Sequence, residues 1–368
     1  MPRLRRTPRR KRSLPISMPD MSDEPRILKY TEALKEATEQ AMAADPKVFV
    51  VGLGVSYKNG ADGTTAGLKA LYPERVLDVP VSEDAFTGMA VGAAIHGLRP
   101  IVHHGRVEFA LFAADQIFTQ AAKWNYMFGG GHPVPIVFRI NIGRQWGNGP
   151  QHTQALYGLF GSALGLKVVI PSSPYMAKGL LAAAIRDNNP VVLLEPRWNF
   201  QLKEAVPKEP YVLPLDRAHI VHEGADITVV SYGDGLIAAR EALELVGDDV
   251  DIDMIDLVSI NPIDHDTVIA SVRKTGRLIT VDTTNAAFSI GSEVIARVLR
   301  DQDMVLKAPV ASLSCPNVPC PTSTALTERY YPTKVDVANA ILAMLGKAPI
   351  DMPLSFEELH MAPTHTIL

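Results

Sequence analysis

The sequence predicts an α/β protein with two doubly wound domains, in which helices cover both faces of a mostly parallel sheet. The chain has 368 residues, more than one ordinary hydrophobic core usually organises. Short β-branched runs alternate with helical periodicities, as in parallel sheets with helical crossovers. A charged stretch rich in proline, predicted as a linker at 201–218, divides this alternation into two series.

The first series spans 26–200. Helical periodicity over 27–46 ends at a proline, as helices often do. The runs predicted as strands are KVFVVGLG, VLDVPVS, RPIVHHG, PVPIVFRI, LKVVIPS and PVVLLEP. The runs predicted as helices are AFTGMAVGAAIHGL, FALFAADQIFTQAAKWNYMF and PYMAKGLLAAAIRDNN.

The second series spans 219–350. Its predicted strands are ITVVSYG, VDIDMIDL and RLITVD, and its predicted helices are DGLIAAREALELVG, DHDTVIASVRKT and GSEVIARVLR. Residues 351–368 are predicted as a C-terminal tail. This second unit therefore repeats the α/β pattern of the first, with shorter elements.

Composition excludes several classes of protein. The first twelve residues carry seven Lys or Arg and no acid, and residues 1–25 are predicted to be a disordered basic tail. The net charge is −4 even with this tail, which argues against nucleic acid as the main partner. No apolar run approaches the roughly 18 residues of a membrane span. Cys315 and Cys320 fit neither a disulfide framework nor a zinc site, so we expect reduced thiols and a cytoplasmic location.

One segment, DVPVSEDAFTGMAVGAAIHGLRP at 78–100, combines an acidic pair with a helix of small apolar residues. Glu83 and Asp84 open this helix. A carboxylate there is stabilised by the helix dipole by about 0.3–1 kcal/mol. A carboxyl group in dry surroundings can also serve as a catalytic acid. The residues alone leave both roles open for Glu83.

Several long motifs occur together in one order: VPVSEDAFTGMAVGAAIHGLRPIV, AADQIFTQAAKWNYMFGG, PVPIVFR, PQHTQ, LGLKVVIPSSPYMAKGLLAAAIRDNNPVVLLEP, DITVVSYGDGLIAAREALELV and LVSINPID. From about 27 to 345 the chain resembles the β subunit of the first component of 2-oxoacid dehydrogenases. These thiamine-diphosphate enzymes are relatives of transketolase. The resemblance implies a transketolase-like pyrimidine-binding domain at 26–200 and a transketolase C-terminal-like domain at 219–350.

The resemblance assigns roles to individual residues. Glu83, in the motif P-V-S-E, would hydrogen-bond the pyrimidine nitrogen N1′ of thiamine diphosphate. Phe109 would stack on the aminopyrimidine ring, although a core aromatic is the alternative. His152, in PQHTQ, would contact the substrate or the acyl intermediate, although a loop histidine is usually only solvated. His104 and Arg106 are predicted to contribute to cofactor binding.

The chain departs from the family pattern at two places. Where dehydrogenase β subunits typically carry E-F-M-T-F-N-F, this chain has HHGRVEF, so His103, His104 and Arg106 replace acidic, aromatic and small polar residues. Where the family carries G-E-E-V or G-E-D-V, this chain has Gly-Leu-Gly-Val at 52–55. The first departure leaves the identity of the substrate open. The second implies either that a partner residue compensates for the missing acid or that the proton relay differs.

The run NIGRQWGNG before His152 is also unusual. Arg144 could pair with a substrate carboxylate, and Trp146 could line a pocket. An ordinary surface or packing role explains each residue equally well.

The second domain contains Gly233-Asp234-Gly235 but no Asn-Asn pair downstream of it. Thiamine-diphosphate enzymes bind the diphosphate and Mg²⁺ through G-D-G followed by N-N, so this G-D-G is predicted to be a helix-opening turn. The diphosphate and Mg²⁺ would then be held mainly by an α subunit in an α₂β₂ assembly. The helices at 86–98 and 109–128 are predicted as its interface, with a core role as the alternative.

AAAIRDNNP resembles a segment that holds a monovalent cation in some family members. The resemblance implies a K⁺ site formed by Ile136, Ala184, Asp187 and Asn189. A helix C-terminal turn before Pro190 explains the same letters.

The leading hypothesis is the β subunit of a thiamine-diphosphate enzyme that decarboxylates a small 2-oxo acid, with a lipoyl acyltransferase as a further candidate partner. One alternative is half of a split transketolase or of a carboligase. Another is a non-catalytic scaffold that retains the fold and the subunit interface. No nucleic-acid or membrane partner is expected.

Overall fold

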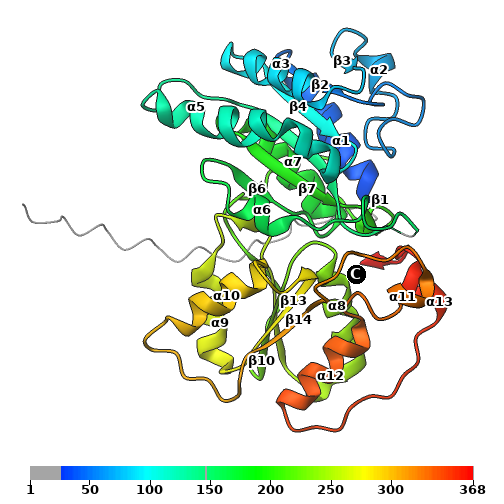
Figure 1. Cartoon of the computed structure of the whole chain (residues 1–368), viewed down its shortest axis with the longest axis vertical. Helices are drawn as coiled ribbons and strands as arrows, with labels where there is room; N and C mark the ends of the chain where they lie inside the picture. Colours follow the sequence, from blue (N-terminus) through cyan, green and yellow to red (C-terminus); the bar gives the residue numbers. More distant parts are fainter. Residues whose placement is uncertain (1–25, 146, 368) are drawn as a thin grey trace, which may run out of the picture.

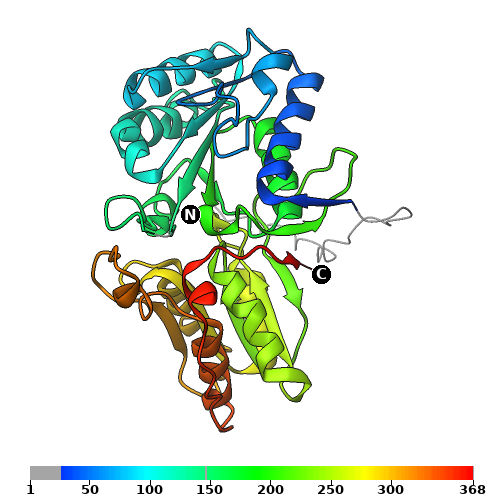
Figure 2. The same ribbon diagram turned by 90° about the vertical axis from the view of Figure 1, so that its right-hand side faces the viewer.

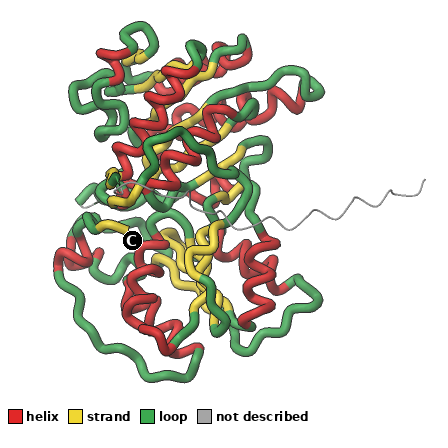
Figure 3. Tube along the Cα trace, turned by 180° about the vertical axis from the view of Figure 1, so that it is seen from behind, coloured by secondary structure: helices red, strands yellow, loops and turns green. Residues whose placement is uncertain are grey.

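The computed structural model describes residues 26–145 and 147–367, so the predicted basic tail at 1–25 lies outside the described residues. Figure 1 shows two α/β halves, one above the other, with the first half of the chain in the upper part. Each half has its own largely parallel sheet. Figure 3 shows the same arrangement from behind, with helices covering the strands. The predicted α/β class is confirmed.

The upper half is built on a seven-stranded sheet in the order β12-β6-β7-β5-β4-β2-β3. Its strands are β2 (Val48–Gly52), β3 (Val76–Asp78), β4 (Arg99–His104), β5 (Val137–Ile142), β6 (Lys167–Val169), β7 (Val191–Pro196) and β12 (Ser259–Asn261). All neighbouring pairs are parallel except β12 with β6. Because β12 comes from the second series, the second half of the chain completes the first sheet.

Alternating side chains of the same strand face two separate cores, as the pleat of a strand requires. In β7, Val192 and Leu194 face the core under α3 (Glu83–Ile95) and α6 (Tyr157–Gly161). Val191 and Leu193 face the core under α1 (Tyr30–Ala44) and α7 (Pro174–Arg186). Both faces of the sheet are therefore dry, which explains the continuous apolar strand sequences. A short helix, α2 (Leu68–Leu71), precedes β3.

The run at 109–128, predicted as one long helix, is helical but irregular. It consists of the end of α4 (Val107–Ala110), a 3₁₀ turn (Leu111–Ala113), a π-helical stretch (Asp115–Ala121) and α5 (Ala122–Met127). The run contains no Gly or Pro that would signal these changes. The wider π turn changes the direction of side chains after Phe109, and such turns are frequent at functional sites.

The lower half has a five-stranded sheet in the order β14-β13-β10-β11-β9, parallel except for the edge strand β9. Its strands are β9 (His219–His222), β10 (Ile227–Ser231), β11 (Ile252–Asp256), β13 (Leu278–Asn285) and β14 (Ala311–Cys315). The helices α8 (Gly235–Val246) and α12 (Lys334–Met344) cover one face. The helices α9 (His265–Thr275) and α10 (Ile290–Leu299) pack into a core that continues into the upper half. The two halves thus share buried apolar surface.

The predicted linker and C-terminal tail are partly ordered into a third sheet between the halves. Its central strand β8 (Lys203–Ala205) pairs with β1 (Ile27–Lys29) and with β15 (Thr366–Ile367). Figure 2 shows the C-terminal segment returning to lie between the two halves. The remaining short helices are η3 (Arg197–Asn199), η4 (Gly247–Asp249), α11 (Thr324–Thr327) and α13 (Phe356–His360). Within the described residues, no helix has both the length and the apolar character needed to cross a membrane.

Candidate active site

The predicted site residues lie at one edge of the upper sheet. Glu83 follows β3, Phe109 follows β4, and His152 follows β5. These strands are parallel, so their carboxyl ends meet at the same edge, where α/β proteins commonly bind ligands. Because β3 and β4 flank β2, the elements that carry Glu83 and Phe109 are separated by roughly 10 Å. That separation leaves space for a ring-sized group above the end of β2.

Glu83 is the first residue of α3 and is half-buried. Its neighbour Asp84 accepts a hydrogen bond from the Gln116 Nε2 atom at 3.1 Å. Glu83 forms no hydrogen bond or ion pair with another residue that the structure describes. The two acidic residues therefore have different roles. Asp84 connects α3 to the π-helical stretch that contains Gln116, and the carboxylate of Glu83 remains available at the helix N-terminus.

Phe109 and His152 are brought into direct contact, with ring centroids 5.6 Å apart in an edge-to-face arrangement. The Phe109 side chain remains partly exposed at 38%. Residues just before Phe109 hold the loop that carries His152. Arg106 Nη1 donates to the His152 carbonyl at 2.6 Å, and the Gln154 N–H donates to Glu108 Oε1 at 2.8 Å. The start of α4 thus fixes the His152 loop from two sides.

Of these positioning residues, Glu108 was not among the predicted site residues. The signal is present in the sequence, where Arg106 and Glu108 come three residues and one residue before Phe109. It could not be interpreted without knowing that the loop after β5 folds over α4.

His104 lies deeper than a cofactor-contacting residue would. It is only 1% exposed, its ring stacks on Phe86 with centroids 5.3 Å apart, and its Nε2 is 3.3 Å from Thr87 Oγ1. In this structure His104 therefore connects the end of β4 to the first turns of α3, the helix that begins with Glu83. Its contribution to the site is positional.

The burial of His104 makes the stability of the protein depend on pH. Burial lowers its pKa to about 4, from 6.5 for an exposed histidine. The unfolded chain binds the proton more readily, so this group's contribution is complete above pH 6.5 and is lost as the pH falls toward 4. From about pH 7 to about pH 5 the free energy of unfolding should fall by about 2 kcal/mol more than in His104→Phe. Urea unfolding at both pH values measures this difference, and parallel losses in the two proteins would contradict it.

His103 occupies the position where the family carries an acidic residue, and it is also buried. Burial, followed by the charge of the Arg139 guanidinium, holds the pKa of His103 well below its usual range. Arg139 finds its counter-charge in Glu195, with Nε–Oε1 at 2.5 Å and Nη2–Oε2 at 2.9 Å, and both side chains are fully buried. The positive charge beside His103 is thus balanced by the Glu195 carboxylate of β7.

The second departure from the family pattern lies in the turn at 52–55, and Asp78 at the end of β3 holds this turn. Asp78 Oδ1 accepts from the Gly54 N–H at 3.0 Å, and Oδ2 accepts from Ser56 Oγ at 2.7 Å. Leu53, in the place of the family's acid, is 40% exposed. The turn above β2 is therefore held by an acid from the neighbouring strand, and the turn itself presents an apolar side chain.

Asp234, in the G-D-G sequence, faces inward between the two halves. It is 1% exposed, and its Oδ1 accepts from Tyr157 OH at 3.3 Å and from Thr283 Oγ1 at 2.8 Å. Gly233 has a positive φ of 55°, and α8 begins at Gly235. The prediction of a helix-opening turn is confirmed. Within residues 26–145 and 147–367, no cluster of three or more His, Cys, Asp or Glu side chains could hold a metal ion.

The oxygens predicted to hold K⁺ already have protein partners. The Ile136 carbonyl accepts from the Val191 N–H at 3.0 Å, and the Ala184 carbonyl accepts from the Asp187 N–H at 3.2 Å. The Asp187 carboxylate pairs with Lys167 and accepts from the Asn189 N–H at 2.8 Å. Lys167 supplies a positive charge beside Asp187, and the turn ends α7 as the helix C-terminal alternative implies, while the K⁺ site stays a prediction.

Arg144 lies at the junction of the two halves and not beside Phe109 and His152. Its guanidinium carbon is 4.0 Å from the ring centroid of Trp198 and 4.7 Å from that of Tyr331. Its Nε is 3.6 Å from Asp234 Oδ2. Arg144 thus packs between two aromatic rings, its pairing with a substrate carboxylate stays a prediction, and Trp146 lies outside the described residues.

The fold and this site define a two-domain protein of the transketolase type. The family model of the transketolase pyrimidine-binding domain matches residues 27–203, and that of the transketolase C-terminal domain matches residues 216–337. A solved split-gene transketolase, described as an inactive β4 tetramer, matches with a TM-score of 0.70 at 21% identity, over 87% of this chain and 98% of its own. At that identity the likeness supports the fold.

Individual sequence relatives identify the family to which the chain belongs within this class. The β subunit of acetoin:2,6-dichlorophenolindophenol oxidoreductase from Cupriavidus necator is 39% identical over 326 residues, covering 86% of this chain and 96% of the relative. The pyruvate dehydrogenase E1 component subunit β of Porphyra purpurea is 41% identical over 301 residues, covering 81% and 90%. The chain belongs to this family of E1 β subunits of pyruvate and acetoin dehydrogenases, which confirms the resemblance read from the motifs.

Proposed function

We propose that the chain is the β subunit of a thiamine-diphosphate enzyme that decarboxylates a small 2-oxo acid, with each active site shared with an α subunit in an α₂β₂ assembly. One observation carries the proposal. The carboxyl edge of the upper sheet presents Glu83, Phe109 and the His152 loop, but the G-D-G acid Asp234 is buried in other contacts. The described chain thus offers the pyrimidine half of a cofactor site without the diphosphate half.

The residues fit the aminopyrimidine end of thiamine diphosphate. Glu83 is half-buried and has no partner among the described residues, so its carboxyl group is available to a ring nitrogen. Phe109 is partly exposed and lies across the end of β2 from Glu83, where a ring could stack on it. When bound, thiamine diphosphate supplies carbanion chemistry at the carbonyl carbon of the substrate. Its diphosphate and Mg²⁺ would be held mainly by the α subunit.

Each protein group then has a defined task. The Glu83 carboxyl would share a proton with the pyrimidine nitrogen, and the partner surface would exclude water from it. His152 would hold or move a proton near the substrate, since its ring lies beside Phe109. Arg106 and Glu108 would keep the His152 loop in place through its backbone.

An exposed apolar face supports the proposed α subunit contact. The helices after β3 and β4 expose Met89 (51%), Phe112 (70%), Tyr126 (89%) and Met127 (66%). Clusters of exposed large apolar side chains mark interaction surfaces. This face adjoins Glu83 and Phe109, so a partner docked there would also cover the candidate site. A lipoyl acyltransferase is the proposed acceptor of the acyl group.

The proposal is tested by co-purifying the chain with its α partner. The complex is expected to decarboxylate a 2-oxo acid only when thiamine diphosphate and Mg²⁺ are present, and neither subunit should do so alone. Formation of a carbon–carbon bond with a free aldehyde acceptor as the main activity would favour the carboligase alternative. A stable complex that is inactive with pyruvate, branched-chain 2-oxo acids and acetoin would favour the scaffold alternative.

A further inference from the structure

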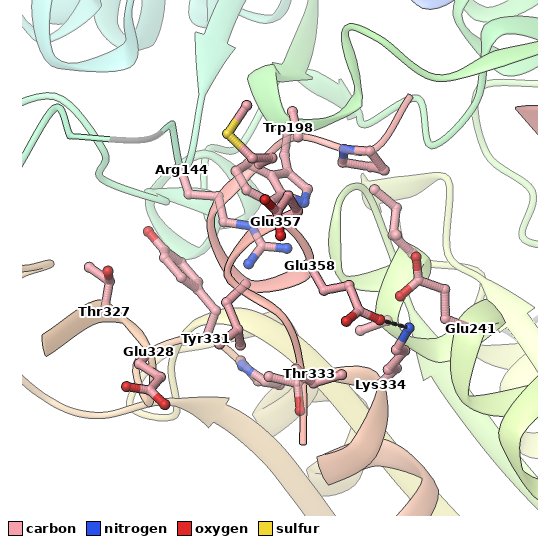
Figure 4. Close-up of a pocket in the computed structure, with 18 of the residues that line it drawn as sticks. Arg144, Trp198, Glu241, Thr327, Glu328, Tyr331, Thr333, Lys334, Glu357 and Glu358 are labelled. Atoms are coloured by element: carbon pink, nitrogen blue, oxygen red, sulfur yellow. Dashed lines mark hydrogen bonds and ion pairs between the residues drawn. The ribbon is translucent and has the colours of Figure 1, made fainter. Parts of the chain in front are cut away.

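A cavity of about 430 Å³ lies where the upper half, the lower half and the C-terminal segment meet. Figure 4 shows Arg144 and Trp198 from the upper half, Glu241 and Lys334 from the lower half, and Glu357 and Glu358 from the C-terminal segment around it. The cavity does not contain Glu83, Phe109 or His152. It is therefore distinct from the candidate active site.

Arg144 presents an unused hydrogen-bonding edge to this cavity. The guanidinium is clamped between the rings of Trp198 and Tyr331, and the side chain is 13% exposed. Its Nε is buried without a hydrogen-bond partner, and its Nη groups form no hydrogen bond with any residue that the structure describes. A rigidly held guanidinium with free donors is suited to bidentate recognition of a carboxylate.

Glu241, on α8, lines the same cavity and is half-buried. Burial raises the pKa of Glu241, and the carboxyl group has no hydrogen bond or ion pair within the described part of the chain. In Figure 4 Arg144 and Glu241 stand on opposite sides of the cavity. Lys334 and Glu358 pair with each other at 2.6 Å and so neutralise their own charges. The Arg144 guanidinium pairs with Asp234 through its Nε at 3.6 Å but keeps its Nη donors free of any partner that the structure describes. These donors and the unpaired carboxyl group of Glu241 thus face one cavity.

The other residues that line the cavity indicate which class of ligand fits it. Ile237, Ala238, Leu354, Leu359 and Met361 provide apolar surface. The rim carries the exposed carboxylates of Glu328 and Glu357, which disfavour a simple anion. A ligand with a carboxylate, an ammonium group and a short apolar side chain would complement Arg144, Glu241 and the apolar lining residues, respectively. We propose that this cavity binds a small apolar amino acid, with its carboxylate on Arg144 and its ammonium group on Glu241.

The site is connected to the loop that carries His152. Gln145, next to Arg144, accepts from Arg106 Nη2 at 3.3 Å and from Asn148 Nδ2 at 3.0 Å. Arg106 also donates to the His152 carbonyl. An amino acid held by Arg144 would therefore restrain the same loop. The binding proposal itself does not depend on the proposed catalytic function, since it concerns the full chain as a binding protein.

Isothermal titration calorimetry of the full chain with L-leucine tests the proposal. Leucine is expected to bind saturably, and 4-methylpentanoate (no amine) and 3-methylbutylamine (no carboxylate) should each bind at least about 10-fold more weakly. Glu241→Gln should weaken leucine binding by a similar factor. Glu244→Gln, on the exposed side of the same helix, is the matched control and should bind as the wild type does.

Two results would overturn the proposal. The first is the absence of saturable heat with leucine up to roughly 10 mM, a range in which even a millimolar Kd gives measurable binding. The second is equal binding of leucine by Glu241→Gln and the wild type. Equal binding of 4-methylpentanoate and leucine would instead show an anion site and would reject the amino acid. If Glu241→Gln lowers the melting temperature, Met361→Trp serves as the second variant. Met361 is 54% exposed on the cavity wall, so the larger side chain should block leucine without disturbing the core.

Discussion

Glu83→Gln in the assembled enzyme is expected to lower kcat for 2-oxo acid decarboxylation by about 10²–10⁴-fold, the usual contribution of a positioned acid or base. Glutamine keeps the size of the side chain and can still hydrogen-bond a ring nitrogen, but it cannot carry the proton. The affinity for thiamine diphosphate should therefore change much less than kcat. Steady-state kinetics of the co-purified complex, at saturating cofactor and Mg²⁺, measures the loss.

Asp84→Asn is the matched control for this experiment. Asp84 lies in the same helical turn, carries the same charge near the same helix dipole, and is bonded to Gln116. Its replacement should leave kcat within a few-fold of the wild-type value. If Glu83→Gln retains full activity, or if both variants lose activity equally, Glu83 is a helix-terminal carboxylate and not the catalytic acid.

Glu195→Gln is expected to have the largest effect on stability. Arg139 and Glu195 are fully buried, and removing one charge leaves the other buried and unpaired. Breaking such a pair costs about 3–5 kcal/mol. Urea unfolding of the wild-type and variant chains measures the change in the free energy of unfolding. The effect should be visible without any α subunit, since both residues lie within the upper sheet.

An exposed ion pair provides the control. Lys35 and Glu39 are 3.7 Å apart on the surface of α1, where such i,i+4 pairs contribute about 0.3–0.5 kcal/mol. Glu39→Gln should therefore be nearly neutral. A Glu195→Gln variant as stable as Glu39→Gln would show that the buried pair does not hold β5 and β7 as inferred.

The fold class was predictable because each α/β unit is coded locally. Alternating β-branched runs and helical periodicities specify strands and crossovers without knowledge of distant contacts. The third sheet was not predictable in this way. Strands β1, β8 and β15 have two or three residues each and exist only because 27–29, 203–205 and 366–367 meet between the halves. The same applies to β12, whose partner β6 lies about 90 residues earlier.

The site was partly predictable for a similar reason. Glu83 and His152 stand in recognisable motifs, and the parallel sheet brings their loops to one edge. His104 was predicted to contact the cofactor, but a neutral imidazole can be buried like the aromatic residue it replaces, and its packing on Phe86 is a tertiary contact. The hydrogen bond from the Arg106 side chain to the backbone carbonyl of His152 cannot be predicted from a motif, since its acceptor is independent of residue type.

The central claim is that this chain supplies the pyrimidine half of a cofactor site that a second subunit completes. Calorimetric titration of thiamine diphosphate, with Mg²⁺, into the chain alone, the αβ complex and the complex carrying Phe109→Ala tests it most directly. We expect saturable binding by the wild-type complex, weakening by about 1–3 kcal/mol in Phe109→Ala from loss of stacking and buried area, and no saturable binding by the chain alone. Equal affinity of the complex with and without the Phe109 ring would contradict the claim.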